Sequence, residues 1–490
     1  MKNKFKKILC IILIIYFSIS IVNKTFENDT YFGIAVGNKI LDVGFYTEED
    51  FSFIEGLEYE NVRWIFDIII ATVYNVFDYL GIYIFVMIIT SIIGLSIYYI
   101  LIKENCPKII ALILTFASIY WAQNVFVPRA QILSFLIFIW EYYFIQRLLE
   151  DKKKRYIVIL FLLAILLANT HASVYPLYLV IFLPFIAEEI LSKMKFFPKK
   201  DSKIVIENKN ALKFLVIAFV VSLFGGLITP LGIAPYINMF KTVGEISSDF
   251  ISEMQPITPA LSPQTIYFII IFVTIIGFSK AKVKLSDTLF LFGFSLLSFS
   301  NYRSVYFLLL LGSFAIGNIL TNFYKEYKLG GISLDKKTYT GIEVIAVLIV
   351  IIISTDNLFT NIIKDYENPE LCPTGVVNYV YKNFEEDEIK KMRIYNGFNF
   401  GSYMEFKGLP VFMDSRAEIY LSNFNNTTII EDFLKLTSGE VHYNEIFEKY
   451  DVNYVLLENN SMIINYIYND ENWNLLYQDN YFSFYEKVEE

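Results

Sequence analysis

The sequence predicts a polytopic α-helical membrane protein with about eleven transmembrane helices, followed by a small extracytoplasmic α/β domain. Three observations carry this prediction. Apolar residues make up 55% of the 490 residues, and the mean hydropathy is +0.47, which exceeds the apolar share of an ordinary soluble chain. These residues form runs long enough to cross a bilayer, and lysine-rich segments follow every second run. After residue 373 the apolar runs shorten to the length of strands.

The apolar runs define the expected spans. They lie near 5–23, 81–102, 108–125, 131–149, 156–170, 173–192, 212–229, 264–280, 286–300, 303–322 and 341–355. We expect the first to be a retained helix rather than a cleaved signal peptide, because Ser18 and Ser20 form only a weak cleavage site.

Lysine in short loops predicts the orientation, since cytoplasmic loops carry most of the Lys and Arg. The amino terminus holds Lys2, Lys4, Lys6 and Lys7 and is therefore expected inside. Counting spans then places the Lys-rich loops on the same side, at 103–108, 151–155, 193–203, 280–284 and 325–337. The loops of the other side are poor in lysine for their length. The chain after residue 356 is therefore expected on the extracytoplasmic face of the plasma membrane.

Charge and cysteine content argue against two other classes of protein. The net charge of −9 comes without a broad basic surface, which argues against a nucleic-acid binder. Cys10, Cys106 and Cys372 lie far apart and share no metal-ligand spacing, so neither a disulfide scaffold nor a zinc site is expected.

The expected membrane domain, residues 1–355, contains an acidic first outer loop at 24–63. Asp29 lies just beyond the first span, where a carboxylate can act as a general base or metal ligand; a solvated loop acid is the other interpretation. The stretch 64–79 is apolar but interrupted by Asp67 and further polar residues, which is typical of an amphipathic helix in the plane of the interface. We count Asp50, Trp64 and Asp67 of this region as candidate cleft residues.

Ionisable residues recur at the outer turns between spans. Arg129, His171 and Arg303 all fall on the side expected for Asp29. Such groups are costly near a bilayer and mark functional candidates, and Arg grips phosphate bidentately. The alternatives are snorkelling of Arg to the headgroups and a hydrogen-bonded structural His. Glu253, in the outer loop 230–263, is either a cleft residue or a surface acid.

Residues 356–490 predict the extracytoplasmic α/β domain. Short apolar runs at 411–413, 454–457 and 481–485 indicate strands, and 373–382, 427–436 and 443–450 indicate helices. The segment 413–420 concentrates Asp414, Arg416 and Glu418. This cluster is either a ligand site at a strand end or an internal ion-pair network that shapes a loop.

Several motifs in combination resemble the GT-C superfamily of membrane glycosyltransferases, in a poorly characterised bacterial branch. In the first loop they are Asp29-Thr-Tyr-Phe-Gly-Ile-Ala-Val-Gly37, Glu49-Asp-Phe-Ser52, and Trp64 with Asp67. At the outer turns they are Pro128-Arg-Ala-Gln131, Asn169-Thr-His171, Thr229-Pro-Leu-Gly232 and Glu253-Met-Gln-Pro256. In the C-terminal region they are Phe400-Gly-Ser-Tyr403 and Phe412-Met-Asp-Ser-Arg-Ala-Glu-Ile-Tyr420. The chain departs from the branch at Val62-Arg63, where its members often have His-Glu.

The resemblance implies a transferase that takes a sugar from a polyprenyl-phosphate donor and passes it, with inversion, to a glycan, lipid or protein of the cell envelope. Asp29 would then be the catalytic base, and Arg129, His171 and Arg303 would hold the lipid phosphate. Some relatives use a divalent metal such as Mg²⁺ or Mn²⁺, but this sequence offers no closed set of ligands. The alternative is a non-catalytic membrane scaffold, or a carrier of lipid-linked sugar or another solute.

Overall fold

The computed structural model describes residues 2–194, 202–241, 255–258, 260, 262–327 and 336–488. The chain divides into two compact units. Unit 1 contains Met1–Asn23, Ile82–Phe240 and Ser248–Lys364, and unit 2 contains Lys24–Gly81, Lys241–Ser247 and Asp365–Glu490. The first outer loop, which the sequence groups with the membrane domain, thus packs with the C-terminal residues in unit 2.

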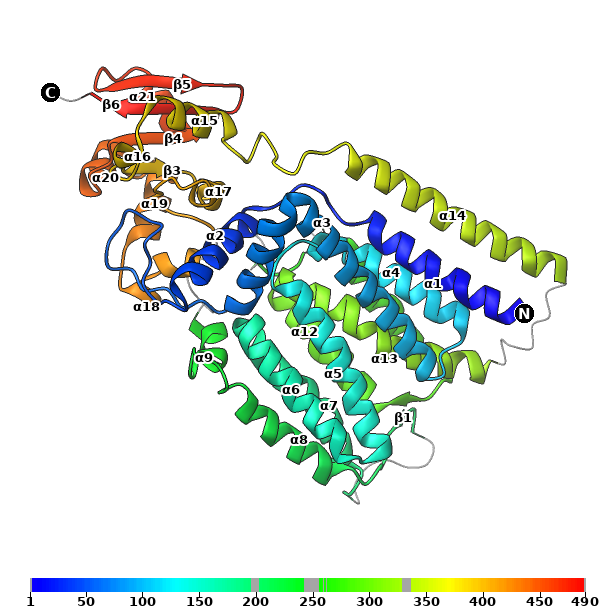
Figure 1. The fold of residues 1–490 in the computed structure, drawn as a ribbon. Coiled ribbons are helices and arrows are strands. Elements are labelled where there is room, and N and C mark those ends of the chain that lie inside the picture. Colours follow the sequence, from blue (N-terminus) through cyan, green and yellow to red (C-terminus); the bar gives the residue numbers. More distant parts are fainter. Residues whose placement is uncertain are drawn as a thin grey trace. The chain divides into compact units, whose positions relative to one another are not determined.

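Unit 1 is a helical bundle whose helices coincide with the expected spans (Figure 1). Its helices are α1 (Lys2–Ser20), the later part of α3 (Trp64–Lys103), α4 (Lys108–Trp121), α5 (Gln131–Asp151), α6 (Lys154–Thr170), α7 (Tyr175–Leu191), α8 (Leu212–Gly225), α9 (Ala234–Lys241), α11 (Pro263–Phe278), α12 (Leu285–Ser300), α13 (Val305–Glu326) and α14 (Lys336–Ile362), with the short 3-10 turns η1 (Gln123–Val125), η2 (Ala172–Val174) and η4 (Tyr302–Ser304). Two-residue strands β1 (Ile204–Val205) and β2 (Val283–Lys284) pair in parallel.

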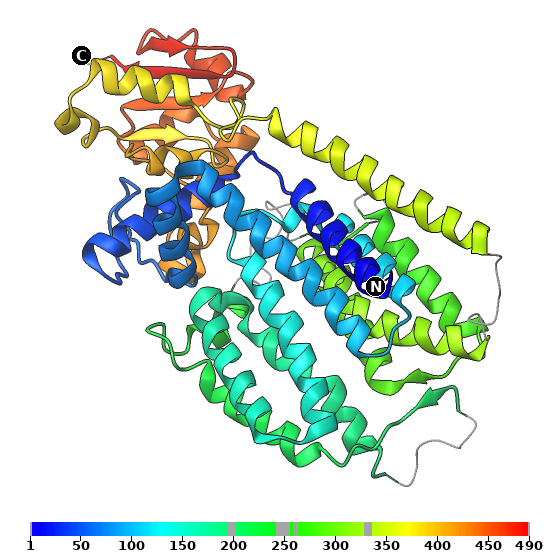
Figure 2. The ribbon, with the colours of Figure 1, turned by 45° about the vertical axis from the view of Figure 1, so that its right-hand side comes forward.

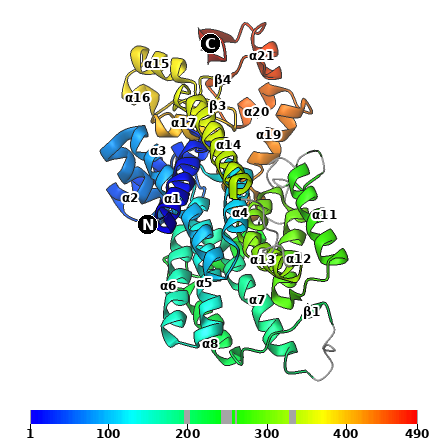
Figure 3. The same cartoon turned by 90° about the vertical axis from the view of Figure 1, so that its right-hand side faces the viewer.

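Five helices in the described part of the chain are long and apolar enough to cross a membrane, namely α3, α5, the η2–α7 segment, the η4–α13 segment and α14 from Val344. Four shorter apolar helices accompany them, in α4, α8, α11 and α12. Helix α13 is almost wholly buried and packs against α12, which lies beside it in Figure 3. Helix α14 packs on α1, where Asn361 Nδ2 donates to the Ser20 carbonyl at 3.0 Å. The outward faces stay apolar, as in a protein solvated by lipid.

Unit 2 combines a mixed sheet with helices from both ends of the chain (Figure 2). Its strands are β3 (Ile394–Asn396), β4 (Tyr454–Glu458), β5 (Trp473–Gln478) and β6 (Phe482–Lys487), in the order β3-β4-β6-β5, with β3 and β4 parallel and the other pairs antiparallel. Its helices are α2 (Asn28–Val43), the first part of α3, α15 (Thr374–Asn383), α16 (Glu386–Ile389), α17 (Gly401–Phe406), the 3-10 turn η6 (Ala417–Tyr420), α18 (Ser422–Asn425), α19 (Ile429–Ser438), α20 (Tyr443–Lys449) and α21 (Met462–Ile467).

Strands β4 and β6 and helices α15, α19 and α20 coincide with expected elements. The strand expected at 411–413 is wrong. Val411 makes only an isolated bridge to Ser52 of the first loop, and the three residues are buried without joining the sheet. An apolar run indicates that a segment is buried, but it does not specify which strand, if any, the segment pairs with. Strands β3 and β5 were not expected.

Helix α3 consists of two helical parts joined at a kink at Asp78, where the backbone is not helical and φ is 58°. Its first part, up to this kink, belongs to unit 2 and packs against α2. The contact is close because both Gly33 and Gly37 lack a side chain. A Cβ at Gly37 would lie 2.1 Å from the Asp67 carbonyl oxygen, and one at Gly33 would lie 2.6 Å from Ile70 Cδ1.

Candidate functional site

Asp29 lies in the first turn of α2, after the N-cap residue Glu27. The partial positive charge of a helix N-terminus favours an acidic side chain at this position. Arg63, which precedes α3, reaches this turn and donates from Nη2 to the Asp29 main-chain carbonyl at 3.1 Å. Helix α2 and the start of α3 are therefore joined at the residue that the sequence proposes as catalytic.

Asp67 is fully buried one turn into α3, and Arg63 Nε lies 3.1 Å from its Oδ1. Trp64 lies at the start of the same helix, half-buried, with its ring edge-on to Phe45 at 6.1 Å. Since α2 and α3 meet through glycines, Asp67 lies against Gly33, whose Cβ position is 3.0 Å from Asp67 Oδ1. Asp67 thus belongs to the interface between the two helices.

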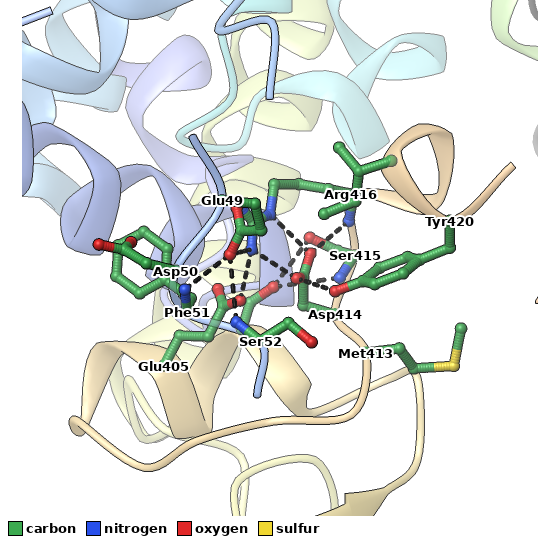
Figure 4. Close-up of polar contacts among 12 residues, drawn as sticks. Glu49, Asp50, Phe51, Ser52, Glu405, Met413, Asp414, Ser415, Arg416 and Tyr420 are labelled. Atoms are coloured by element: carbon green, nitrogen blue, oxygen red, sulfur yellow. Dashed lines mark hydrogen bonds and ion pairs between the residues drawn. The ribbon is translucent and has the colours of Figure 1, made fainter. Parts of the chain in front are cut away.

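Arg416 is the centre of a buried ion cluster (Figure 4). Its guanidinium donates to Glu405 Oε1 at 2.6 Å and to both oxygens of Asp414, at 2.9 and 2.6 Å. It also binds both oxygens of Glu49, one of them at 3.0 Å. The Tyr420 hydroxyl donates to Asp414 Oδ2 at 2.6 Å. Three carboxylates therefore share one guanidinium.

The cluster joins the first loop to the C-terminal residues of unit 2. Glu49 Oε1 accepts the main-chain N–H groups of Phe51 and Ser52, at 2.7 and 3.2 Å. The N–H of Phe53 donates to the Val411 carbonyl at 3.1 Å. Since the cluster side chains are at most 2% exposed, its geometry is that of an internal tie and not of an open ligand site.

The carboxyls of Glu405 and Asp414 differ in pKa, because one guanidinium cannot compensate all the negative charge of the cluster. Burial raises the pKa of Glu405 well above its usual value, and the nearby charges of Asp414 and Glu49 act in the same direction. The pKa of Asp414 is lowered to about 2, because the attraction and hydrogen bonds of Arg416 outweigh its burial. Glu405 therefore keeps its proton to a higher pH than Asp414 does.

Glu418 connects the cluster to the Asp29 region electrostatically. It is half-buried, and burial raises its pKa. The charges of Asp414 and Asp29 also raise this pKa, whereas Arg63 lowers it. The acids that the sequence proposed in the first loop and in the outer-domain cluster thus influence one another within unit 2.

In unit 1, two of the three proposed phosphate ligands lie at the start of α5. Arg129 comes two residues before this helix and is half-buried. The Ser134 hydroxyl, in the first turn of α5, lies 2.7 Å from His171 Nδ1. His171 itself precedes the η2–α7 segment. The arrangement gathers basic side chains at helix N-termini, which favour anions.

Arg303 occupies the equivalent position before α13, in the turn η4. The first turns of α5 and α13 are neighbours, because the rings of Phe135 and Phe307 pack with centroids 5.1 Å apart. The main-chain carbonyl of Gln255 accepts the N–H of Tyr302 at 2.9 Å, so the loop 230–263 reaches this turn. Glu253 of that loop lies outside the described residues.

Asp50 lies outside the buried Arg416 cluster. Its side chain is 63% exposed and forms an ion pair with Lys39. Its neighbour Glu49 is the residue that binds Arg416, and sequence reasoning missed it together with Glu405 and Arg63. The Glu49-Asp-Phe-Ser52 motif was a signal for this position, but it could not distinguish which of two adjacent acids points inward.

No three His, Cys, Asp or Glu side chains converge to hold a metal ion in the ranges that the structure describes. Asp29, Asp67 and Glu418 share a neighbourhood without forming such a cage. The described residues therefore do not fit a closed divalent-metal site.

A helical membrane unit together with a unit built from the first loop and the C-terminal α/β region defines a multi-pass membrane protein of the GT-C fold, which confirms the expected fold family. The solved structures that share this fold include the oligosaccharyltransferase AglB from the archaeon Archaeoglobus fulgidus in complex with an inhibitory peptide and a dolichol-phosphate, with 12% identity, a TM-score of 0.55, and coverage of 93% of this chain and 70% of that one. The oligosaccharyltransferase of the same organism tethered to an acceptor peptide gives 10% identity, a TM-score of 0.58, and coverage of 93% and 69%.

A third structure, the same organism's oligosaccharyltransferase in complex with Zn and sulfate, gives 12% identity, a TM-score of 0.54, and coverage of 92% and 68%. At these identities the likeness concerns the fold. No protein-family model and no curated protein sequence matches the chain.

Proposed function

We propose that the chain is an inverting glycosyltransferase that moves a sugar from a polyprenyl-phosphate carrier to a cell-envelope acceptor on the extracytoplasmic face. The observation that carries the proposal is the GT-C fold, shared over 93% of the chain with an enzyme whose structures hold a dolichol-phosphate and an acceptor peptide. Within unit 1, Arg129, His171 and Arg303 at helix starts are of the kind that binds phosphate, and within unit 2 Asp29 at the start of α2 is of the kind that accepts a proton.

In the proposed reaction an acceptor hydroxyl oxygen attacks the anomeric carbon of the donor sugar. The bond between this carbon and the phosphate oxygen breaks, and the lipid phosphate leaves with the electron pair. Asp29 takes the hydroxyl proton, as a positioned carboxylate can. A single displacement of this kind inverts the anomeric centre.

The leaving phosphate carries the negative charge that develops during the reaction, and cations held in place stabilise such a charge. Arg129 and Arg303 supply guanidinium groups at the starts of α5 and α13, and His171 adds an imidazole oriented by Ser134. Helix N-termini add partial positive charge at both arginines. The same groups also suit a carrier of lipid-linked sugar, which is the rival function.

The test is transfer from a panel of radiolabelled polyprenyl-phosphate sugars into cell-envelope material, comparing wild type with Asp29→Asn. Asp42→Asn is the matched control, because Asp42 is an exposed acid near the other end of the same helix. Transfer that Asp29→Asn abolishes and Asp42→Asn retains is the expected result. Transfer that survives Asp29→Asn would remove Asp29 from the reaction, and no transfer with any donor would favour the carrier or scaffold.

A further inference from the structure

Arg63 stands at the position where the chain departs from the GT-C branch, and the structure gives it a defined set of contacts. Its Nη2 donates to the Asp29 carbonyl at 3.1 Å, and its Nε lies 3.1 Å from Asp67 Oδ1. In a helix that carbonyl also receives the N–H four residues on, that of Gly33. Arg63 therefore binds the first turn of α2 from the side, through a main-chain carbonyl.

Three features hold Arg63 itself in place. Its side chain is only 12% exposed, and Asp67, its ionic partner, is fully buried. Its guanidinium lies over the Phe32 ring, 4.2 Å from the centroid, a contact that is stronger when the cation is shielded from water. Burial raises the pKa of Asp67 to about 7, and Arg63 is the largest influence that favours its charged form, so the two side chains hold each other as an ion pair.

Phe32 also contacts the ion cluster. Arg416 lies over the same ring at 4.8 Å, and its guanidinium is bound by Glu49, Glu405 and Asp414. The first turns of α2 are thus held through one ring by two arginines, one anchored in α3 and one in the C-terminal residues.

We propose that Arg63 is the positioning residue of the first-loop acid, which it holds through the Asp29 main chain with Asp67 and Phe32 as its supports. This inference rests on the proposed function, in which Asp29 removes the acceptor proton. Arg63 then acts on catalysis without touching the donor. Loss of its guanidinium lets the turn move, and small misplacements of a catalytic group lower the rate steeply.

The experiment compares Arg63→Met, Arg63→Lys and the control Lys39→Met. Lys39 is a cation near the far end of α2, where it binds the exposed Asp50. Amide hydrogen exchange is measured over residues 28–34 and, as an internal reference, over 38–43. The kcat and the donor KM are measured on the same samples, and burial of the Cys372 thiol against a maleimide reports that unit 2 is folded.

We expect Arg63→Met to speed exchange in 28–34 but not in 38–43, and to lower kcat by about 10- to 100-fold with the donor KM unchanged. Arg63→Lys should be intermediate, because a compact ammonium group cannot reach the Asp29 carbonyl and the Asp67 carboxylate together as the planar guanidinium does. If Arg63→Met fails to fold, Arg63→Lys carries the test.

Unchanged exchange in 28–34 would overturn the inference whatever the activity. Faster exchange with wild-type kcat would also overturn it, because the position of the turn would then not matter. A raised donor KM with unchanged kcat would make Arg63 a donor ligand instead. If wild type transfers nothing, the proposed function fails, and the exchange data still decide whether Arg63 holds the turn.

Discussion

Replacing Arg416 with Met should unfold unit 2 at a markedly lower temperature while leaving unit 1 unaffected. The substitution removes the one cation shared by the carboxyls of Glu49, Glu405 and Asp414, all of them buried. Removing one partner of a buried ion pair costs about 3–5 kcal/mol, because the remaining charge has no compensation. At about 2–4 °C per kcal/mol for a unit of this size, the midpoint should fall by roughly 6–20 °C.

The cysteines make the assay specific for each unit. Cys372 is 3% exposed in unit 2, its thiol donates to the Tyr31 hydroxyl at 3.6 Å, and burial raises its pKa to about 11. Since the thiolate is the reactive form, a maleimide dye reaches Cys372 only after unfolding. Cys106, buried in unit 1, serves the same purpose there. Variants that keep only one of these cysteines report the two units separately.

Lys390→Met is the matched control, since Lys390 forms a solvent-exposed pair with Asp387 at 3.9 Å and such pairs contribute about 0–1 kcal/mol. Arg416→Lys should lie between the two, because Lys cannot bind two carboxylates bidentately. If Arg416→Met labels Cys372 at the temperature of the Lys390→Met control, the cluster does not tie the first loop to the C-terminal residues. An equal fall at Cys106 would show that the substitution acts on the whole chain.

The ion cluster, the contact of α2 with α3, and the proposed phosphate ligands each give one further prediction. Burial holds the pKa of Glu405 above its ordinary value of 4.5, so its contribution to stability is complete below that value and is lost as the pH rises; Glu405→Gln, which cannot ionise, should reduce the fall in the thermal proteolysis midpoint of unit 2 as the pH is raised above about 5, and an equal fall would contradict a raised pKa of Glu405. Gly37→Val would place a side chain against the Asp67 carbonyl, 2.1 Å from its Cβ position, and should destabilise unit 2 by about 1–3 kcal/mol or more in the Cys372 assay; a wild-type midpoint would refute the close contact of α2 and α3. Arg129→Gln and Arg303→Gln should each raise the donor KM several-fold without exposing Cys106, and an unchanged donor KM would remove that arginine from the phosphate site.

The helices of unit 1 could be predicted from the sequence because a run of apolar residues is a local pattern. Each expected span coincides with a helix, from α1 to α14, since a run of apolar residues is long enough by itself to specify the element. In unit 2 the same approach found β4 and β6 but missed β3, which has three residues. It also predicted a strand at 411–413, where burial is present and strand pairing is reduced to one bridge to Ser52.

The candidate site was only partly predictable. The sequence singled out Asp29, Asp67, Asp414 and Arg416, and these four lie in one compact unit. Of the adjacent acids Glu49 and Asp50, however, it selected the one that faces solvent. Arg63 was counted as a departure from the GT-C branch, and only its contact with the Asp29 carbonyl gives it a position in the site.

What the sequence determined alone was the series of apolar helices, the acidic first loop and the motifs that resemble the GT-C branch. Only the tertiary structure decided that this loop packs with the C-terminal residues, and that Arg416 is neutralised by Glu49 from 367 positions away. The reason is physical. Helix and span signals depend on neighbours within a few turns, whereas the partner of a buried charge is set by which distant segments pack together, since any carboxylate of suitable reach would satisfy the same guanidinium.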